Sequence, residues 1–245
     1  MRLSLSVWAM AWVVFPVYAQ QPAPSPAAPV TPPVGQGVNG DWAYIERYRA
    51  ANQSLIADST PKRVVVFMGD SITQGWAAEP FIKDNPNFVG RGISGQTAPQ
   101  MLVRFRSDVI ALKPAIVHIM AGTNDVAQNT GPETTAETEG YIKSMVDLAL
   151  ANKIKVVLAS IPPANEFYWH PGLSPVPQIR ALNAWLKEYA ASRRLTYIDY
   201  WSVLATPEGA MKPEYSADGV HPNAAGFEAM RPLAKAAIDG ALKRP

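Results

Sequence analysis

The chain has 245 residues, 48% of them hydrophobic, and a formal net charge of +2. This composition suffices to bury a sizeable core, for which one domain is the simplest prediction. The near-neutral charge and the lack of a Lys/Arg run with interleaved aromatics argue against a nucleic-acid partner. Because the sequence has no cysteine, disulfides, thiolate catalysis and Cys-based metal sites are excluded.

The N-terminus has the pattern of a secretory signal peptide. A positive start at Arg2 precedes an almost wholly apolar stretch, and Val17-Tyr18-Ala19 matches the small-x-small cleavage pattern. The alternative is a membrane anchor, but the apolar run is short for a span and Pro16 interrupts it. We therefore expect residues 1–19 to be a signal peptide, the protein to be periplasmic or secreted, and no stable membrane insertion.

Residues 20–40 are rich in Pro and Ala and predict a disordered leader. The folded domain is expected over residues 41–245. Its first element should be a helix capped by Asp41 that packs on the outside of a sheet. The apolar positions that share one face of this helix are Trp42, Ile45, Tyr48 and Leu55.

Five buried apolar runs predict strands, at residues 64–67, 87–92, 115–121, 155–161 and 195–200. Helical periodicity is found between and after them, at residues 97–112, 133–152 and 179–189 and beyond Asn223, which is placed as an N-cap. Thr97 and Gln100 form a capping box for the first of these helices, and Pro114 ends it. This alternation predicts an α/β fold with a central parallel sheet of about five strands and helices on both faces.

Polar turns at Ser71, Gly95 and Asn124 follow three of the predicted strands. Since ligands bind beyond the carboxyl ends of parallel strands, these turns should meet at one edge of the sheet. Ser71 stands at a strand-to-helix junction, where unpaired N–H groups face a developing oxyanion, and is a candidate nucleophile. Read alone, Gly-Asp-Ser is also ordinary turn and N-cap chemistry.

A serine nucleophile needs a base, and the chain has three histidines. His118 lies inside an apolar run, which favours a core histidine, and His170 lies in a long aromatic loop, residues 164–177, where contact with substrate is conceivable. His221 follows Asp218 by three residues across a turn. Asp218 is therefore placed to accept the Nδ1–H of His221 and leave Nε2 free for the serine proton.

Four segments carry a family resemblance. Gly69-Asp70-Ser71-Ile72-Thr73, Gly92-Ile93-Ser94-Gly95, Gly122-Thr123-Asn124-Asp125 and Asp218-x-x-His221 resemble, in order, the four blocks of the SGNH (GDSL-type) hydrolase superfamily of esterases and lipases. The likeness covers residues 62–242. Ile72 stands where the eponymous motif has leucine, an apolar exchange. The G-x-S-x-G elbow of α/β-hydrolases is absent.

The resemblance implies a three-layer flavodoxin-like fold. It implies Ser71 as nucleophile, His221 as general base and Asp218 as its orienting partner. The oxyanion hole would comprise the N–H groups of Ser71 and Gly95 and the amide of Asn124. Gly95, Asn124 and Asp218 also have plain turn-forming interpretations, and Asp70 and Asp125 are read as residues that organise loops. No metal or organic cofactor is required.

The expected function is hydrolysis of short-chain acyl esters, acetyl above all, on small molecules or O-acetylated carbohydrate, through an acyl-enzyme on Ser71. A lysophospholipase or thioesterase and a non-catalytic carbohydrate-binding relative are the alternatives; no His and carboxylate cluster favours metal-dependent hydrolysis. The sequence predicts no oligomeric state. Aromatic residues that are candidates to line the substrate pocket, with core or loop packing as the equal alternative, are Trp76, Phe81, Phe167, Tyr168 and Trp169.

Overall fold

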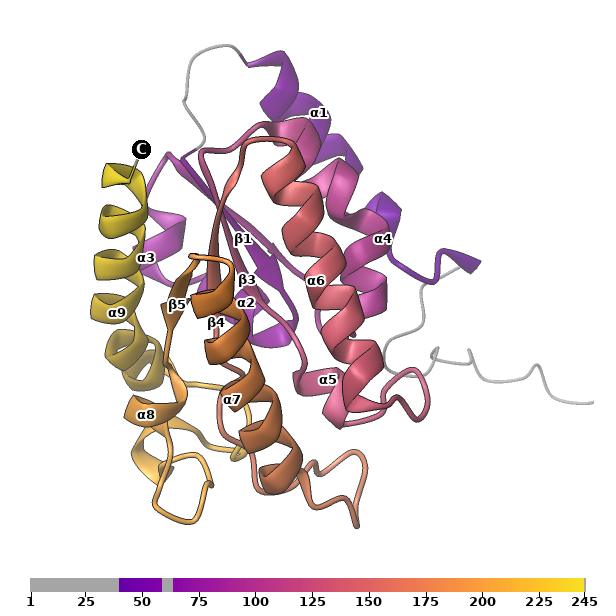
Figure 1. Ribbon diagram of the computed structural model, residues 1–245, viewed down its shortest axis with the longest axis vertical. Coiled ribbons are helices and arrows are strands. Elements are labelled where there is room, and N and C mark those ends of the chain that lie inside the picture. The colour runs from indigo at the N-terminus through magenta and orange to yellow at the C-terminus, as the bar shows by residue number, and fades with distance from the viewer. Residues whose placement is uncertain (1–39, 59–63, 245) are drawn as a thin grey trace, which may run out of the picture. The chain divides into compact units, whose positions relative to one another are not determined.

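The computed structural model describes residues 40–58 and 64–244 (Figure 1). The expected signal peptide, residues 1–19, and the expected leader, apart from Gly40, lie outside the described residues. Both therefore stay predictions.

Five parallel strands form one sheet in the order β2-β1-β3-β4-β5. This confirms the predicted central parallel sheet. Strand β1, which is second in this order, pairs on one side with β2, where Val65 faces Phe88, and on the other with β3, where Val65 faces Ile116. The strands are β1 (Val65–Gly69), β2 (Phe88–Gly92), β3 (Ile116–Met120), β4 (Lys155–Ala159) and β5 (Thr196–Ile198).

Helices cover both faces of the sheet, giving three layers (Figure 1). The helices are α1 (Arg49–Ala57), α2 (Ser71–Trp76), α3 (Pro80–Lys83), α4 (Ala98–Asp108), α5 (Thr123–Val126), α6 (Thr135–Ala151), α7 (Pro175–Ser192), α8 (Trp201–Leu204) and α9 (Ala224–Lys243). Short 3₁₀ turns are η2 (Ile45–Tyr48), η3 (Ile110–Leu112) and η4 (Pro213–Tyr215). Within the described residues, no helix has the length and apolarity that a bilayer span needs.

The sheet buries both faces because successive strand side chains point to opposite sides. Val66 and Met68 of β1 belong to the core shared with α4, α6 and α7. Val65 and Phe67 belong to the other core, shared with α2, α3, α8 and α9. All four side chains are fully buried, which explains why the strand reads as a continuous apolar run rather than an alternating one.

The first helix differs from its prediction. Asp41 does accept hydrogen bonds, from the N–H groups of Ile45 (2.9 Å) and Glu46 (3.0 Å), but the chain first makes the 3₁₀ turn η2 and then α1. Trp42 precedes both and is 42% exposed, so it is not part of a buried face. Because α1 packs on α4 and η3, the sheet is covered here by α4.

The helix expected over residues 97–112 ends earlier than predicted. Its capping box of Thr97 and Gln100 is present, but α4 stops at Asp108. Leu112 belongs to the separate turn η3, which ends at Lys113 with a left-handed φ of 51°. Apolar spacing continues across such a break because a 3₁₀ turn buries its side chains against the same core.

The end of β2 approaches α2 closely. A Cβ on Gly92 would lie 2.2 Å from the backbone nitrogen of Gln74 and 2.6 Å from the carbonyl oxygen of Asp70. Only glycine fits at this contact. The close packing brings the loop after β2 beside the start of α2, so that two of the three predicted polar turns become neighbours.

Candidate active site

Ser71, His221 and Asp218 form a hydrogen-bonded row. The Nε2 atom of His221 lies 2.9 Å from the Oγ of Ser71, and its Nδ1 lies 2.7 Å from the Oδ2 of Asp218. Ser71 begins α2, whereas the other two precede α9, so the row joins segments 150 residues apart. With the proton on Nδ1, the ring donates to Asp218 and its Nε2 accepts from the serine hydroxyl.

The turn that carries Asp218 and His221 is held by local hydrogen bonds. The Oδ1 of Asp218 accepts from the N–H groups of Val220 (2.9 Å) and His221 (2.8 Å). The Ser216 hydroxyl donates toward the carbonyl oxygen of His221 (2.8 Å) and accepts from the N–H of Gly219 (3.0 Å). Sequence reasoning missed Ser216, whose only signal was its place in a polar turn.

These bonds also set the charge of Asp218. Partial burial raises its pKa, but the backbone N–H and ring of His221 and the N–H of Val220 outweigh burial and lower the pKa to about 2. A carboxylate that accepts several N–H bonds is stabilised in its ionised form. Asp218 is therefore an anion at neutral pH.

Ser71 is positioned by the residue before it. The Oδ1 of Asp70 caps α2 by accepting from the N–H of Ile72 (2.9 Å), as expected for an N-cap. Asp70 is 1% exposed, and burial raises its pKa to about 6 against the opposing effects of this N–H and of nearby His221. Asp70 therefore organises the loop, as predicted, and holds the strand-to-helix turn that carries the serine.

Asn124 is oriented by two neighbours. Its Nδ2 donates to the carbonyl oxygen of Gln96 (3.0 Å), and its Oδ1 accepts from the Nδ2 of Asn129 (2.8 Å). Asn129 also donates to the carbonyl oxygen of Gly95 (3.0 Å). An amide nitrogen carries two hydrogens, so one N–H of Asn124 is left for a ligand. Asn129 was missed by sequence reasoning because a lone asparagine in a turn carries no signal of its own.

The other two predicted oxyanion donors are backbone N–H groups. Within residues 40–58 and 64–244, neither the N–H of Ser71 nor that of Gly95 donates a hydrogen bond. Gly95 has a φ of 77°, a left-handed conformation that favours glycine. The loops thus present two N–H groups and one side-chain amide at the carboxyl edge of the sheet.

Comparison with known proteins agrees with this geometry. The model of the GDSL-like lipase/acylhydrolase family matches residues 67–229. This range includes the row and the predicted oxyanion donors, which together are Ser71, Gly95, Asn124, Asp218 and His221. The chain belongs to this family. It is accordingly an SGNH-type hydrolase, and the resemblance stated from its sequence is confirmed.

Solved structures resemble this acylhydrolase over most of its length. A protein of Bacteroides fragilis, provisionally named an acylhydrolase, is 46% identical, with 82% of this chain and 99% of that chain covered and a TM-score of 0.78. A GDSL-like lipase from Bacteroides thetaiotaomicron is 45% identical over 81% and 98%, with a TM-score of 0.77. An acetylxylan esterase from Geobacillus stearothermophilus, 22% identical over 73% and 94% with a TM-score of 0.58, shares the fold. No curated protein matches the chain.

A buried ion pair connects two of the loops that form the candidate active site of the acylhydrolase. The Arg104 guanidinium donates to Asp108 (2.9 Å), to the side chain of Gln96 and to the carbonyl oxygen of Gly69 (3.0 Å). Arg104 and Asp108 are both fully buried. Arg104 thus ties the end of β1, just before the serine, to the loop that carries Gly95.

Asp125 fixes the start of α4 from the neighbouring loop. Both of its carboxylate oxygens accept from the N–H of Ala98 (3.0 and 3.1 Å). Burial raises the pKa of Asp125, and the nearby Glu133 carboxyl raises it further. As predicted, Asp125 organises loops: it holds the N–H of Ala98, three residues after Gly95.

The aromatic residues predicted to line a pocket fall into two groups. Trp76 and Phe167 are each 1% exposed, and Trp76 packs in the core against Phe227, so neither is available to a ligand and the prediction for both is corrected. Their apolar character fits core packing equally well, and sequence alone did not separate the two uses. The ring centroids of Trp169 and His221 lie 6.2 Å apart. Tyr168 is 63% exposed and packs edge-to-face against the ring of Trp169.

Phe81 also packs with the core aromatic residues, because its ring stacks on that of Trp76.

The two other histidines of the acylhydrolase lie outside the row. His118 is fully buried beside the hydroxyl of Tyr200, and burial lowers its pKa to about 3, as suits a core histidine. His170 contacts the carbonyl oxygen of Ala127 through Nδ1 (2.7 Å). Among the described residues, no group of three or more His, Asp or Glu is placed to hold a metal ion.

Proposed function

We propose that this acylhydrolase is a serine esterase that removes short acyl groups, acetyl above all, from small-molecule or carbohydrate esters. The observation that carries the proposal is the row of Ser71, His221 and Asp218, in which both hydrogen bonds have the length that proton transfer needs. A non-catalytic relative would have no reason to keep all three side chains in register.

In the first step, the Oγ of Ser71 attacks the ester carbonyl carbon. The Nε2 of His221 takes the hydroxyl proton, and the ionised Asp218 stabilises the imidazolium that forms. The tetrahedral intermediate then expels the alcohol, which receives the proton from Nε2 as the carbon–oxygen bond breaks. The acyl group remains on Ser71.

The negative charge of the intermediate needs donors at the carbonyl oxygen. The free N–H groups of Ser71 and Gly95 and the second N–H of Asn124 are proposed for this role. Because Asn129 and Gln96 hold the Asn124 amide in place, the donor is oriented before substrate binds. Donors fixed in advance stabilise the transition state without reorganisation during the reaction.

In the second step, a water molecule replaces the alcohol. His221 takes a proton from the water as its oxygen attacks the acyl carbon, and then returns the proton to Oγ as the acyl-serine bond breaks. The products are a carboxylic acid and free enzyme, so the cycle consumes one water and needs no cofactor.

A short acyl chain is favoured by the aromatic surroundings of the row. With Trp76 and Phe167 inside the core, the aromatic surface beside His221 comes from Trp169, whose Nε1 donates to Asn129 (2.8 Å). A long acyl chain needs an extended apolar lining. One ring anchored by a hydrogen bond suits a small group better.

The test is hydrolysis of p-nitrophenyl acetate, butyrate and octanoate by the wild type, by Ser71→Ala and by Ser192→Ala. Ser192 is an exposed serine at the end of α7, so its variant is a matched control. We expect fastest turnover of the acetate, loss of turnover in Ser71→Ala, and no loss in the control. Fastest turnover of the octanoate would favour the lysophospholipase alternative, and equal rates in wild type and Ser71→Ala would refute the serine mechanism.

A further inference from the structure

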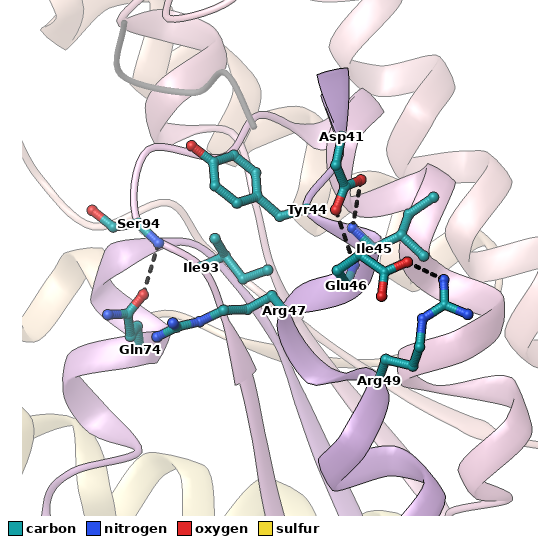
Figure 2. A pocket seen from close by; sticks show the side chains of 9 residues that line it. All are labelled: Asp41, Tyr44, Ile45, Glu46, Arg47, Arg49, Gln74, Ile93 and Ser94. Carbon is teal, nitrogen blue, oxygen red and sulfur yellow. Dashed lines mark hydrogen bonds and ion pairs between the residues drawn. The ribbon is translucent and has the colours of Figure 1, made fainter. Parts of the chain in front are cut away.

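A cavity of about 930 Å³ lies between the N-terminal turn η2 and the loop that follows β2 (Figure 2). Its walls include Tyr44 and Arg47 on one side and Gln74, Ile93 and Ser94 on the other. None of these residues belongs to the row of Ser71, His221 and Asp218. The cavity is therefore a separate feature whose relation to that row has to be established.

The cavity borders the catalytic loops through two contacts. Gln74 follows Ser71 by three residues on α2, which places both on one side of the helix. The Oε1 of Gln74 accepts from the N–H of Ser94 (2.9 Å), and Ser94 immediately precedes Gly95. The cavity wall thus includes one residue of the helix that Ser71 begins and the residue that precedes Gly95.

The acidic groups of the cavity already have partners. The carboxylate of Asp41 accepts from the N–H groups of Ile45 and Glu46, and the side chain of Glu46 forms an ion pair with Arg49 (Figure 2). The charge of Glu46 is therefore compensated by Arg49, and the carboxylate of Asp41 is stabilised by two backbone N–H groups of the same short segment.

Arg47 is different. Its side chain is exposed and, within the part of the chain that the structure describes, its guanidinium makes no hydrogen bond or ion pair. Figure 2 shows it extended below Ile93 with its guanidinium group beside Gln74. The cavity thus offers one cation without an ion-pair partner, beside Gln74, and a guanidinium pairs with carboxylates in bidentate geometry.

We propose that this cavity binds a carboxylate on the alcohol part of the ester, so that the substrate is an acylated acidic sugar. The inference rests on the proposed esterase function and specifies its substrate class. The ring of Tyr44 stands above Ile93 in the cavity and offers an aromatic surface to a sugar (Figure 2). A singly charged carboxylate matches the single unpaired cation, whereas a phosphate monoester would bring a second negative charge close to Asp41 and Glu46.

The test compares two substrates that differ in one charge, O-acetyl glucuronic acid and O-acetyl glucuronamide, by the release of acetate. We expect the wild type to prefer the acid by about two- to fivefold in kcat/KM, which is the size of one ion pair at an exposed site. The preference should fall in 0.5 M NaCl because the guanidinium is exposed to solvent. At this salt concentration the Debye length is roughly 4 Å, so an exposed ion pair is strongly screened.

Arg47→Gln should reduce the ratio of the two kcat/KM values to about one, and Arg47→Lys should keep part of it because lysine retains the charge but not the planar fork. Arg106→Gln is the matched control. Arg106 is an exposed arginine on α4 outside the cavity, so its loss should leave the ratio as in the wild type. A wild-type ratio near one, or a ratio that survives Arg47→Gln, overturns the proposal, as does a stronger preference for O-acetyl glucose 6-phosphate.

Binding of free glucuronate, followed by NMR, separates this proposal from the esterase function. If no ester is hydrolysed but glucuronate binds to the wild type and not to Arg47→Gln, the cavity binds a carboxylate as proposed, whereas the esterase proposal and the substrate class that rests on it fail. If esters are hydrolysed by way of Ser71 without a charge preference, the esterase proposal holds and the cavity proposal fails.

Discussion

The Arg104 guanidinium donates a hydrogen bond to the carbonyl oxygen of Gly69, two residues before Ser71 (3.0 Å). The same group holds the side chain of Gln96, the residue after Gly95. One buried cation thus connects the segments that carry the proposed nucleophile and one of its oxyanion donors. Its own charge is balanced by Asp108.

Replacing Arg104 with methionine should destabilise the protein strongly. The substitution leaves Asp108 buried without its cation, which typically costs about 3–5 kcal/mol. Urea unfolding of Arg104→Met would measure the loss. The double variant Arg104→Met with Asp108→Leu should recover much of it, because no buried charge is then left alone. A single variant as stable as the wild type would show that the pair contributes little.

Replacing Asn124 with alanine should lower kcat with little change in KM. The substitution removes one proposed oxyanion donor, and such a loss typically lowers the rate by about 10²–10³. Steady-state kinetics with p-nitrophenyl acetate would show it. Asn152→Ala, which changes an exposed asparagine at the end of α6, is the control. A rise in KM with kcat unchanged would mean instead that Asn124 binds the ground state as strongly as the transition state.

The proposed mechanism needs a neutral imidazole, so activity should rise with pH. Only the neutral ring has an Nε2 that accepts from Ser71. Because the pKa of Asp218 is lowered to about 2, this carboxylate is already ionised when the rise occurs and does not contribute to the acid limb of kcat/KM. A profile that stays flat through the range in which histidines titrate, about pH 5–8, would argue against His221 as the base.

Asp70 should make the fold less stable as pH rises. In the folded protein its pKa is about 6, above the ordinary value of 3.8 for an aspartate. The unfolded carboxyl therefore ionises first, and stability present at low pH is lost as pH rises through 6. Asp70→Asn keeps the cap but does not titrate. Its free energy of unfolding relative to that of the wild type should therefore increase by roughly 1–3 kcal/mol from a pH below 3.8 to a pH above 6.

Thermal melts of both proteins across this pH range would test the Asp70 prediction, with the exposed residue Asp84 changed to asparagine as the control. A difference between Asp70→Asn and wild type that does not vary with pH would contradict it. The activity of Asp70→Asn need not follow its stability, because Asp70 also adjoins Ser71.

The sheet and the three functional side chains were predictable because their signals are local. Buried parallel strands read as apolar runs, such as that preceding Ser71, and Asp218 and His221 lie within one turn of each other. The edge at which these residues meet follows from the parallel topology alone. The predicted row therefore needed no long-range information beyond the alternation of strands and helices.

The supporting residues were not predictable in the same way. Asn129, Ser216 and Arg104 act through contacts with residues that are distant in sequence or in a turn of unremarked composition. Apolar residues raise the opposite difficulty, since Trp76 and Trp169 have the same chemistry, yet one packs in the core and the other stands beside His221. Burial is decided by the tertiary packing, which a single sequence does not state.

The separation of 150 positions between Ser71 and His221 means that the hydrogen-bonded row forms late in synthesis. The serine follows the first strand of the sheet, whereas the histidine follows the last one, so a ribosome-bound chain holds the nucleophile long before its base is made. If Ser71 and His221 have the proposed roles, the hydroxyl has no proton acceptor during this interval, and we expect a partly translated chain not to hydrolyse an ester. Onset of turnover would therefore report, in a translation reaction, the moment at which the C-terminal helix has emerged and docked.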